Sequence, residues 1–368
     1  MKVAIVTEFY YPHLGGVTEH VHHLGLELRR RGHVVTIVTS HMDGQRADPP
    51  FVRRVGTSRV IYSNGSFARI TTGWGLTRRL ESVLRESAAD LVHVQDGLAP
   101  VLGPFAADAA GRLGLPVVAT FHSWFPRSIG CRVFQRPLQR RFDRLAARIA
   151  VSEPVVRALS RYFRGSWEII PNGVDVDLFH PNGRRPTDYL SRGPRLLFLG
   201  RLDPRNGLDT VLDAMPGILH RHPTTTLVIA GDGPLRRMYE RAARPLGTAV
   251  RFVGRVNGER PHYYGTADLY LCPTTKASFG ITLLEAMACG TPFLASDIIG
   301  FRELVDGGGE AVLVPPRRPD DWARAVVELI DDPGRRAEMG VAGRNKAAAY
   351  SWPRVADRVL AVYQRALE

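Results

Sequence analysis

Residues 276–292, KASFGITLLEAMACGTP, say more about fold and function than any other part of this chain. They follow the apolar run 269–271, so the order is a strand, a loop of small residues and a helix. Backbone N–H groups at a helix start are unpaired and carry the positive end of the helix dipole, which suits them to a diphosphate. Glu285, in the opening turns of the helix, could then accept hydrogen bonds from a ribose. The loop residues of this candidate site are Ser278, Phe279, Gly280 and Ile281.

A packing role explains the same stretch without a ligand. Strand-loop-helix units are common in parallel sheets. Gly290 is then an ordinary helix C-cap before Thr291 and Pro292. The residues by themselves leave both explanations open.

Length and composition indicate a soluble globular protein of two domains. A chain of 368 residues exceeds one ordinary core, and no run approaches the roughly 20 apolar residues of a membrane span. The opening MKVAIVTEFYYP has too short an apolar run for a signal peptide and predicts a first strand. Because the three cysteines lie far apart without CxxC spacing, we expect no metal site, no disulfide and a cytoplasmic location. These are Cys131, Cys272 and Cys289.

The net charge of +13 comes almost entirely from arginine, since only Lys2, Lys276 and Lys346 are lysines. A basic surface attracts nucleic acid, anionic lipid headgroups or phosphorylated small molecules, and composition does not choose among them. Arginine enrichment could equally reflect genome composition. Basic residues do not interleave with aromatic ones, so nucleic acid is not expected as a partner.

Short β-rich runs alternate with helical patterns along the whole chain, which predicts α/β domains with parallel sheets. The predicted strands of the first half, where a helix occupies 18–31, are 2–7, 33–39, 91–94, 116–121 and 148–151. Those of the second half are 195–199, 226–230, 250–253, 269–271, 291–295 and 311–314. Turn formers at 170–175 and 181–186 mark a linker. We therefore expect one Rossmann-like domain over 1–172 and a second over 173–351, followed by an amphipathic helix over 352–368.

Two further segments follow predicted strands of the first domain. The paired glycines Gly15 and Gly16 precede a helix, where a backbone can come close to an anion, although they do not form the G-x-G-x-x-G dinucleotide pattern. His122 ends the strand VVATF, and residues at the carboxyl ends of parallel strands project into the binding crevice. A single histidine is more often structural, so function is the less common explanation of His122 on residues alone.

The segment 276–292 resembles the signature of retaining glycosyltransferases of family GT4, which have the GT-B fold. In that family two glutamates eight positions apart bracket the run SFGxxLLEAMAxGxP. Glu285 matches the second glutamate, which holds the nucleoside ribose, whereas Ala277 stands at the first, which contacts hydroxyls of the donor sugar. The resemblance implies two Rossmann-like domains facing across a cleft, with the C-terminal helix crossing back to the first domain.

Residues 200–207, GRLDPRNG, are similar to the family pattern G-R-x-x-x-x-K-G, whose Arg and Lys neutralise the departing diphosphate. Arg201 matches, but Asn206 stands at the lysine position and supplies no charge. Arg205 and Lys276 are the cations nearest in sequence to the two altered positions. We expect them to substitute.

The resemblance assigns the remaining site residues. Gly15 and Gly16 would face the donor diphosphate, His122 the donor sugar, and the backbone of Arg255 or Val256 the nucleotide base. Several stretches are similar to the bacterial phosphatidylinositol mannosyltransferase subgroup, which transfers mannose from GDP-mannose to a lipid headgroup at the inner membrane face. They include 62–69, 118–123, 148–152 and 171–177. This likeness implies that Asn64 and Thr18 lie on the acceptor side.

The helix that opens at residues 77–85 has a basic side, and its equivalent in that subgroup meets anionic lipid. A solvated charged face is the alternative. Peripheral contact with an anionic membrane is therefore an expectation alongside the cytoplasmic location.

The resulting hypothesis is a retaining transferase that moves a hexose, with mannose favoured, from GDP-mannose or a UDP-sugar to a hydroxyl of a lipid or glycan. His122, Arg201 and Gly16 would act at the reacting centre without a metal or other cofactor, and domain closure about 171–186 would bring the halves together. Ala277 and Asn206 favour a non-catalytic nucleotide-sugar-binding protein as the alternative. A GT-B epimerase and a nucleic-acid-binding protein are weaker alternatives.

Overall fold

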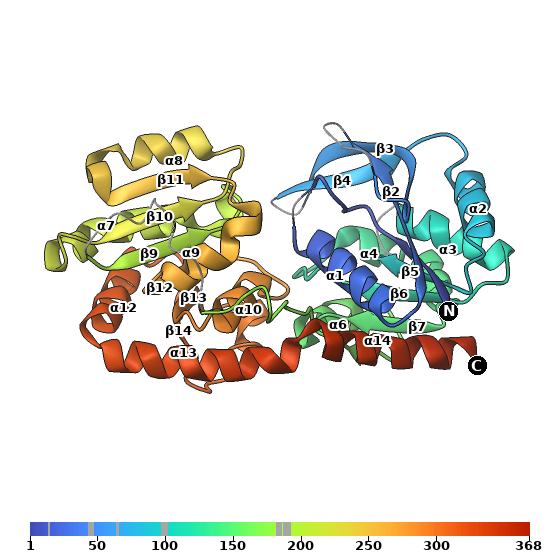
Figure 1. The fold of residues 1–368 in the computed structure, drawn as a ribbon. Helices are drawn as coiled ribbons and strands as arrows, with labels where there is room; N and C mark the ends of the chain where they lie inside the picture. The colour runs from blue at the N-terminus through green and yellow to red at the C-terminus, as the bar shows by residue number, and fades with distance from the viewer. Residues whose placement is uncertain (14, 43–47, 64–65, 97–101, 182–185, 187–192) are drawn as a thin grey trace. The chain divides into compact units, whose positions relative to one another are not determined.

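The computed structural model describes residues 1–13, 15–42, 48–63, 66–96, 102–181, 186 and 193–368. Within them the chain divides into two compact units, shown in Figure 1. Unit 1 comprises Met1–Gly173 and Trp352–Glu368, and unit 2 comprises Val174–Ser351. The sequence predicted divisions after residues 172 and 351. Each unit is a mostly parallel sheet with helices packed on it, so the predicted α/β class with two Rossmann-like domains is confirmed.

Unit 1 has an eight-stranded sheet in the order β4-β3-β2-β1-β5-β6-β7-β8. All neighbouring strands are parallel except β3 and β4, which pair antiparallel at the edge. Its strands are β1 (Lys2–Val6), β2 (Val34–His41), β3 (Val52–Ser63), β4 (Ser66–Thr72), β5 (Leu91–Gln95), β6 (Val117–Phe121), β7 (Ala147–Ala150) and β8 (Glu168–Ile169). Its helices are α1 (Gly16–Arg30), α2 (Leu76–Glu86), α3 (Leu102–Arg112), α4 (Ile129–Val133), α5 (Gln135–Phe142), α6 (Glu153–Ser160) and α14 (Trp352–Leu367).

Unit 2 has a six-stranded parallel sheet in the order β11-β10-β9-β12-β13-β14. Its strands are β9 (Arg195–Leu199), β10 (Thr226–Ala230), β11 (Val250–Gly254), β12 (Leu269–Cys272), β13 (Phe293–Ser296) and β14 (Ala311–Val314). Its α-helices are α7 (Leu208–Arg221), α8 (Arg236–Ala242), α9 (Arg260–Thr266), α10 (Ile281–Ala288), α11 (Ile299–Arg302), α12 (Pro319–Asp331) and α13 (Pro333–Ala347). Short 3₁₀ turns are η1 (Pro204–Asn206), η2 (Arg244–Ala249), η3 (Asn257–Glu259) and η4 (Ala348–Tyr350).

Both sheets reverse their strand order at one point. The reversal lies between β1 and β5 in unit 1 and between β9 and β12 in unit 2. Ligands of open α/β sheets bind outside the carboxyl ends of the strands at such points. The loops after these four strands are therefore the candidate ligand-binding loops of each unit.

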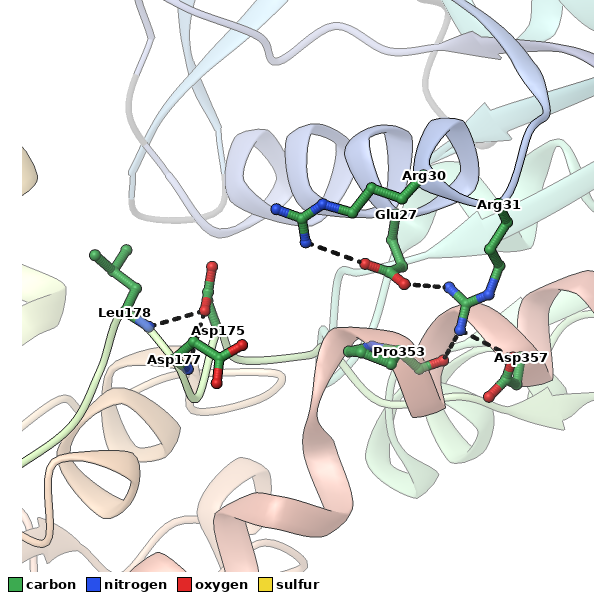
Figure 2. A network of polar contacts seen from close by, with 8 residues as sticks. All are labelled: Glu27, Arg30, Arg31, Asp175, Asp177, Leu178, Pro353 and Asp357. Atoms are coloured by element: carbon green, nitrogen blue, oxygen red, sulfur yellow. Dashed lines mark hydrogen bonds and ion pairs between the residues drawn. The ribbon is translucent and has the colours of Figure 1, made fainter.

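The C-terminal helix α14 belongs to unit 1 although unit 2 precedes it in the chain. Its apolar residues, from Trp352 to Tyr363, share one core with residues of β1 and α1. Polar contacts reinforce this packing: Arg31 donates to Glu27 on α1 (2.5 Å), to Asp357 (3.0 Å) and to the carbonyl oxygen of Pro353 (2.9 Å), as Figure 2 shows. The charge cluster ties α14 to the end of α1.

The first residues of unit 2 form a compact turn of their own. The Asp175 side chain accepts hydrogen bonds from the backbone N–H groups of Asp177 (3.1 Å) and Leu178 (2.9 Å), also drawn in Figure 2. The turn formers that the sequence assigned to a linker are used here to start unit 2.

Several boundaries differ from the sequence prediction. Strands β3, β4 and β8 were not predicted, and β3 lacks a clear apolar pattern because it carries Arg53, Arg54 and Arg59. The strand expected at 291–295 begins at Phe293, because the N–H of Thr291 instead donates to the carbonyl oxygen of Ala286 (2.9 Å) and ends α10. Over the residues that the structure describes, no helix combines the length and apolar character needed to cross a bilayer.

Candidate functional site

The loop after β9 holds Arg201 on a buried carboxylate. The Arg201 guanidinium donates to one oxygen of Asp203 through Nε (2.9 Å) and Nη2 (2.8 Å), and Asp203 is 1% exposed. The other Asp203 oxygen accepts from the N–H groups of Arg205 (3.1 Å) and Asn206 (3.2 Å). Asp203 therefore fixes both the loop and the direction of the Arg201 side chain. The sequence signal for it was an Asp before a Pro at a helix start, a common N-cap pattern.

Asn206, which stands where the family has lysine, makes a hydrogen bond to the backbone of its own loop. Its amide nitrogen donates to the carbonyl oxygen of Arg201 (2.6 Å). Besides Arg201, this loop carries the cation Arg205, whose carbonyl oxygen accepts from the N–H (2.8 Å) and hydroxyl (3.1 Å) of Thr275. This pairing fastens the loop after β9 to the loop after β12, where exposed Lys276 is the next residue.

The loop 276–280 leads into α10 as the sequence predicted. Gly280 is the N-cap, and no side chain caps the helix. Helix α11 packs closely against this loop. A Cβ atom on Gly300 would lie only 1.9 Å from the carbonyl oxygen of Ala277. An uncapped helix start beside Lys276 and Arg205 concentrates positive potential at the switch point of unit 2.

Glu285 on α10 is buried, and its partners include two residues of α9. Its carboxylate accepts from Arg260 Nη1 (2.7 Å) and from the Tyr264 hydroxyl (3.1 Å), and the residue is 2% exposed. Burial and the neighbouring Glu285 charge raise the pKa of Tyr264. The sequence predicted Glu285 but neither of these partners on α9. A ribose bound beside Glu285 would therefore meet a carboxylate that Arg260 and Tyr264 already orient.

The segment expected beside the base follows β11. The carbonyl oxygen of Gly254, the last residue of β11, accepts from the N–H of Gly231 (2.6 Å). The side chain of the next residue, Arg255, pairs with Asp232 (3.5 Å). Val256 is buried. The structure thus brings the loops after β9, β10, β11 and β12 to one edge of the unit 2 sheet.

In unit 1 His122 directly follows β6, at the carboxyl end of the sheet and beside the end of β5. The His122 backbone N–H donates to Asp96 (2.8 Å), and its ring Nε2 contacts Gln95 Oε1 (2.7 Å). Asp96 has a backbone φ of 55°, a left-handed conformation that costs a non-glycine residue energy and is concentrated at functional sites. Burial raises the pKa of the Asp96 carboxyl to about 6. Neither Asp96 nor Gln95 was predicted.

Burial also keeps the histidines of this edge uncharged. It lowers the pKa of His122 to about 3 and the pKa values of His20 and His93 as well. The His20 and His122 rings meet edge to face at 4.8 Å, and His20 Nδ1 bonds to Asn172 (2.9 Å). An aromatic group of this kind offers hydrogen bonds but no positive charge.

The remaining predicted residues of unit 1 divide into exposed and buried ones. Gly15 is the N-cap of α1, Gly16 is its first residue, and both are exposed. Thr18 is fully buried, and its hydroxyl has no hydrogen-bond partner among the described residues. Asn64 lies outside the residues that the structure describes.

Known proteins share both sequence and fold with this chain. A family model described as Glycosyltransferase Family 4 matches residues 14–178, and one described as Glycosyl transferases group 1 matches residues 193–332. The phosphatidyl-myo-inositol mannosyltransferase of Mycobacterium tuberculosis is 33% identical over 371 residues, which span 99% of this chain and 97% of that protein. The D-inositol 3-phosphate glycosyltransferase of Nocardiopsis dassonvillei is 30% identical over 95% of this chain and 89% of its own.

Solved structures match at lower identity. A sucrose-phosphate synthase from Thermosynechococcus elongatus has a TM-score of 0.76 at 22% identity, with 99% of each chain covered. Anabaena HepE in complex with UDP has a TM-score of 0.77 at 19% identity, covering 99% of this chain and 100% of its own. The fold shared with these structures is GT-B, and the chain is a glycosyltransferase. It belongs to glycosyltransferase family 4, as the motifs predicted.

Replacing Gly300 by alanine tests whether α11 supports the loop 276–280. The new Cβ would overlap the Ala277 carbonyl oxygen, so Gly300→Ala should lower the free energy of unfolding by about 1–3 kcal/mol, as overpacking does. Amide hydrogen exchange over 276–283 should also speed up. Gly258→Ala is the matched control, because a Cβ there meets nothing within 4 Å. Equal urea denaturation and exchange for the two variants would refute the supporting contact.

The acid sensitivity of folding should depend on His122. Its pKa is about 3 in the folded protein against an ordinary value of 6.5, so the unfolded chain binds more protons between these pH values. The free energy of unfolding must therefore fall as pH falls from 6.5 toward 3, by up to about 1.4 kcal/mol per pH unit for this residue. His122→Asn should reduce the slope measured by denaturation across the upper part of this pH range. His220 on α7 is exposed, so His220→Asn is the control. An equal reduction of the slope in the His122 and His220 variants would contradict the role of His122.

Proposed function

We propose that this glycosyltransferase moves a hexose, with mannose as the first candidate, from a nucleotide sugar to a hydroxyl of a lipid or glycan acceptor. The observation that carries the proposal is the carboxyl edge of the unit 2 sheet, where Arg201, Arg205 and Lys276 accompany an uncapped helix start. These groups match a diphosphate in charge. The names of the mannosyltransferase relatives and the UDP-glucose complex of Anabaena HepE support the choice of ligand class.

The transfer is proposed to retain the configuration at the anomeric carbon without a metal. Arg201, oriented by Asp203, and the N–H groups near Gly280 would stabilise negative charge as the diphosphate leaves. Glu285 would hold the ribose. His122 and Gly16 would orient the sugar, so that the leaving diphosphate assists the incoming hydroxyl on the same face.

Ala277 changes the contacts to the donor sugar. A carboxylate at this position would make charge-assisted hydrogen bonds worth about 1.5–3 kcal/mol each. The loop itself is retained, since the Ala277 backbone packs on Gly300. We infer an active enzyme with altered donor contacts. Binding without turnover is the second candidate, favoured by Ala277 and Asn206 together.

Contact with an anionic membrane is part of the proposal, and a second surface supports it besides the basic side of α2 that the sequence indicated. Leu76, Leu80 and Leu84 of α2 are buried in the protein, and its arginines Arg78, Arg79 and Arg85 are exposed. On α4 and the following residue, Ile129, Val133 and Phe134 are 83%, 67% and 59% exposed. The exposed arginines of residues 129–142 are Arg132, Arg136, Arg140 and Arg141. Exposed apolar side chains among arginines suit a lipid surface, each arginine adding about 1 kcal/mol near anionic headgroups.

The donor proposal is tested by incubating the protein with mixed GDP- and UDP-sugars and lipid vesicles, then identifying products by mass spectrometry with and without EDTA. A hexosylated product, formed equally with EDTA, is expected. Arg201→Ala and Lys276→Ala should each weaken GDP or UDP binding in calorimetry by about 10- to 100-fold, the value of a charged hydrogen bond. Arg335→Ala, an exposed change on α13, is the control. Nucleotide binding without any product would instead support the binding-only candidate.

Vesicle co-sedimentation tests the membrane surface. The double variant Ile129→Ser/Phe134→Ser should bind phosphatidylinositol-containing vesicles at least tenfold more weakly than the unmodified protein, because burying each large apolar side chain contributes about 1.5–3 kcal/mol. The matched variant Arg78→Ala/Arg79→Ala on α2 should lose less. Vesicles of uncharged lipid should bind the unmodified protein and both variants weakly. The reverse order of the two variants would return the membrane contact to α2.

A further inference from the structure

A buried chain of hydrogen bonds lies behind His122 in unit 1. Tyr363 on α14 contacts His93 Nδ1 through its hydroxyl (2.6 Å), and His93 Nε2 contacts the Thr120 hydroxyl (2.7 Å). The amide nitrogen of Gln95 lies 3.3 Å from His93 Nε2, and its amide oxygen lies 2.7 Å from His122 Nε2. All five residues are buried. The chain therefore connects the C-terminal helix to the histidine at the sheet edge.

The two imidazole rings in this series of hydrogen bonds are neutral, because burial lowers the pKa values of His93 and His122. A neutral imidazole has one N–H group and one nitrogen with a lone pair. Each ring must therefore present a donor on one side and an acceptor on the other. The partners decide which nitrogen carries the proton.

Gln95 decides it for His122 and contributes to it for His93, whose Nε2 also contacts the Thr120 hydroxyl. Its amide nitrogen can only donate, so His93 Nε2 accepts and the His93 proton lies on Nδ1, facing the Tyr363 oxygen. The Gln95 amide oxygen can only accept, so the His122 proton lies on Nε2. His122 Nδ1 is then the lone-pair nitrogen, and it makes no hydrogen bond with any residue that the structure describes.

We propose that Gln95 is a positioning residue that holds His122 in the Nε2–H tautomer, so that His122 Nδ1 accepts a hydrogen bond from a hydroxyl of the bound sugar. This role in sugar binding rests on the proposed function, whereas the tautomer does not. Asp96 completes the arrangement by accepting the backbone N–H of His122 (2.8 Å). A ring fixed in this way recognises a neutral hydroxyl and disfavours a carboxylate, which would place its own lone pairs against Nδ1.

The tautomer can be read directly by nitrogen-15 NMR of histidine side chains in the full-length protein, with the His122 signals assigned by their loss in His122→Asn. We expect Nδ1 to resonate as an unprotonated nitrogen and Nε2 as a protonated one. The opposite pattern, or a mixture of tautomers in the unmodified protein, would overturn the proposal whether or not any sugar is transferred.

Two substitutions at residue 95 separate positioning from packing. Gln95→Leu removes both amide contacts, and we expect His122 to populate both tautomers. Gln95→Glu places a carboxylate against His122 Nε2, which should raise the pH at which His122 titrates by NMR. In the transfer assay Gln95→Leu should reduce kcat/KM by about tenfold, the value of one hydrogen bond.

Thr120→Val is the matched control, because it deletes a buried contact to His93 and leaves the Gln95–His122 contact in place. It should destabilise the fold comparably while the His122 tautomer stays unchanged. A shifted tautomer in Thr120→Val but not in Gln95→Leu would refute the role of Gln95. If the tautomer behaves as expected but no nucleotide sugar supports transfer in any variant, the proposed function fails and the positioning role stands.

Discussion

At two glycines, the loops after the strands of unit 2 approach one another so closely that no side chain fits. A Cβ atom on Gly231 would lie 1.9 Å from the carbonyl oxygen of Gly200, and one on Gly207 would lie 2.2 Å from that of Pro273. Gly207 also has a φ of 68°, which favours glycine. Because these contacts are made by backbone, the edge that carries Arg201 is held in place by the fold itself. Preorganised donors of this kind are what stabilisation of a developing charge requires.

The two candidate sites satisfy their buried polar groups in different ways. In unit 2 the buried carboxylates of Asp203 and Glu285 pair with Arg201 and Arg260. Unit 1 keeps its histidines neutral and links them through an amide and hydroxyls. An unpaired buried charge would be costly in either place. The outcome is an edge with arginine and lysine side chains in unit 2 and one with directional but uncharged hydrogen bonds in unit 1, which suits the diphosphate and the sugar of the proposed function respectively.

The sequence predicted the elements whose pattern is local. Strands β9, β10 and β14 have the predicted bounds because each is a continuous apolar run between turn formers, and both class and family followed from the motif around Glu285. Strand β3 was missed because its arginines break the apolar pattern. Arg260 and Gln95 were missed for another reason. Each matters only through a partner that folding brings to it from another element, and a single sequence carries no mark of that partner.

The two departures from the family pattern are coupled through charge. Asn206 in place of lysine removes one positive charge, and Ala277 in place of glutamate removes one negative charge, so the sum over the two positions is unchanged. Both residues retain a structural role, since the Asn206 amide holds the Arg201 carbonyl (2.6 Å) and the Ala277 backbone packs on Gly300. Lys276 then adds one positive charge beside the altered position. Under the proposed function, losing only the lysine would weaken the attraction for a diphosphate, whereas the paired change with Lys276 would preserve it and alter chiefly what faces the sugar.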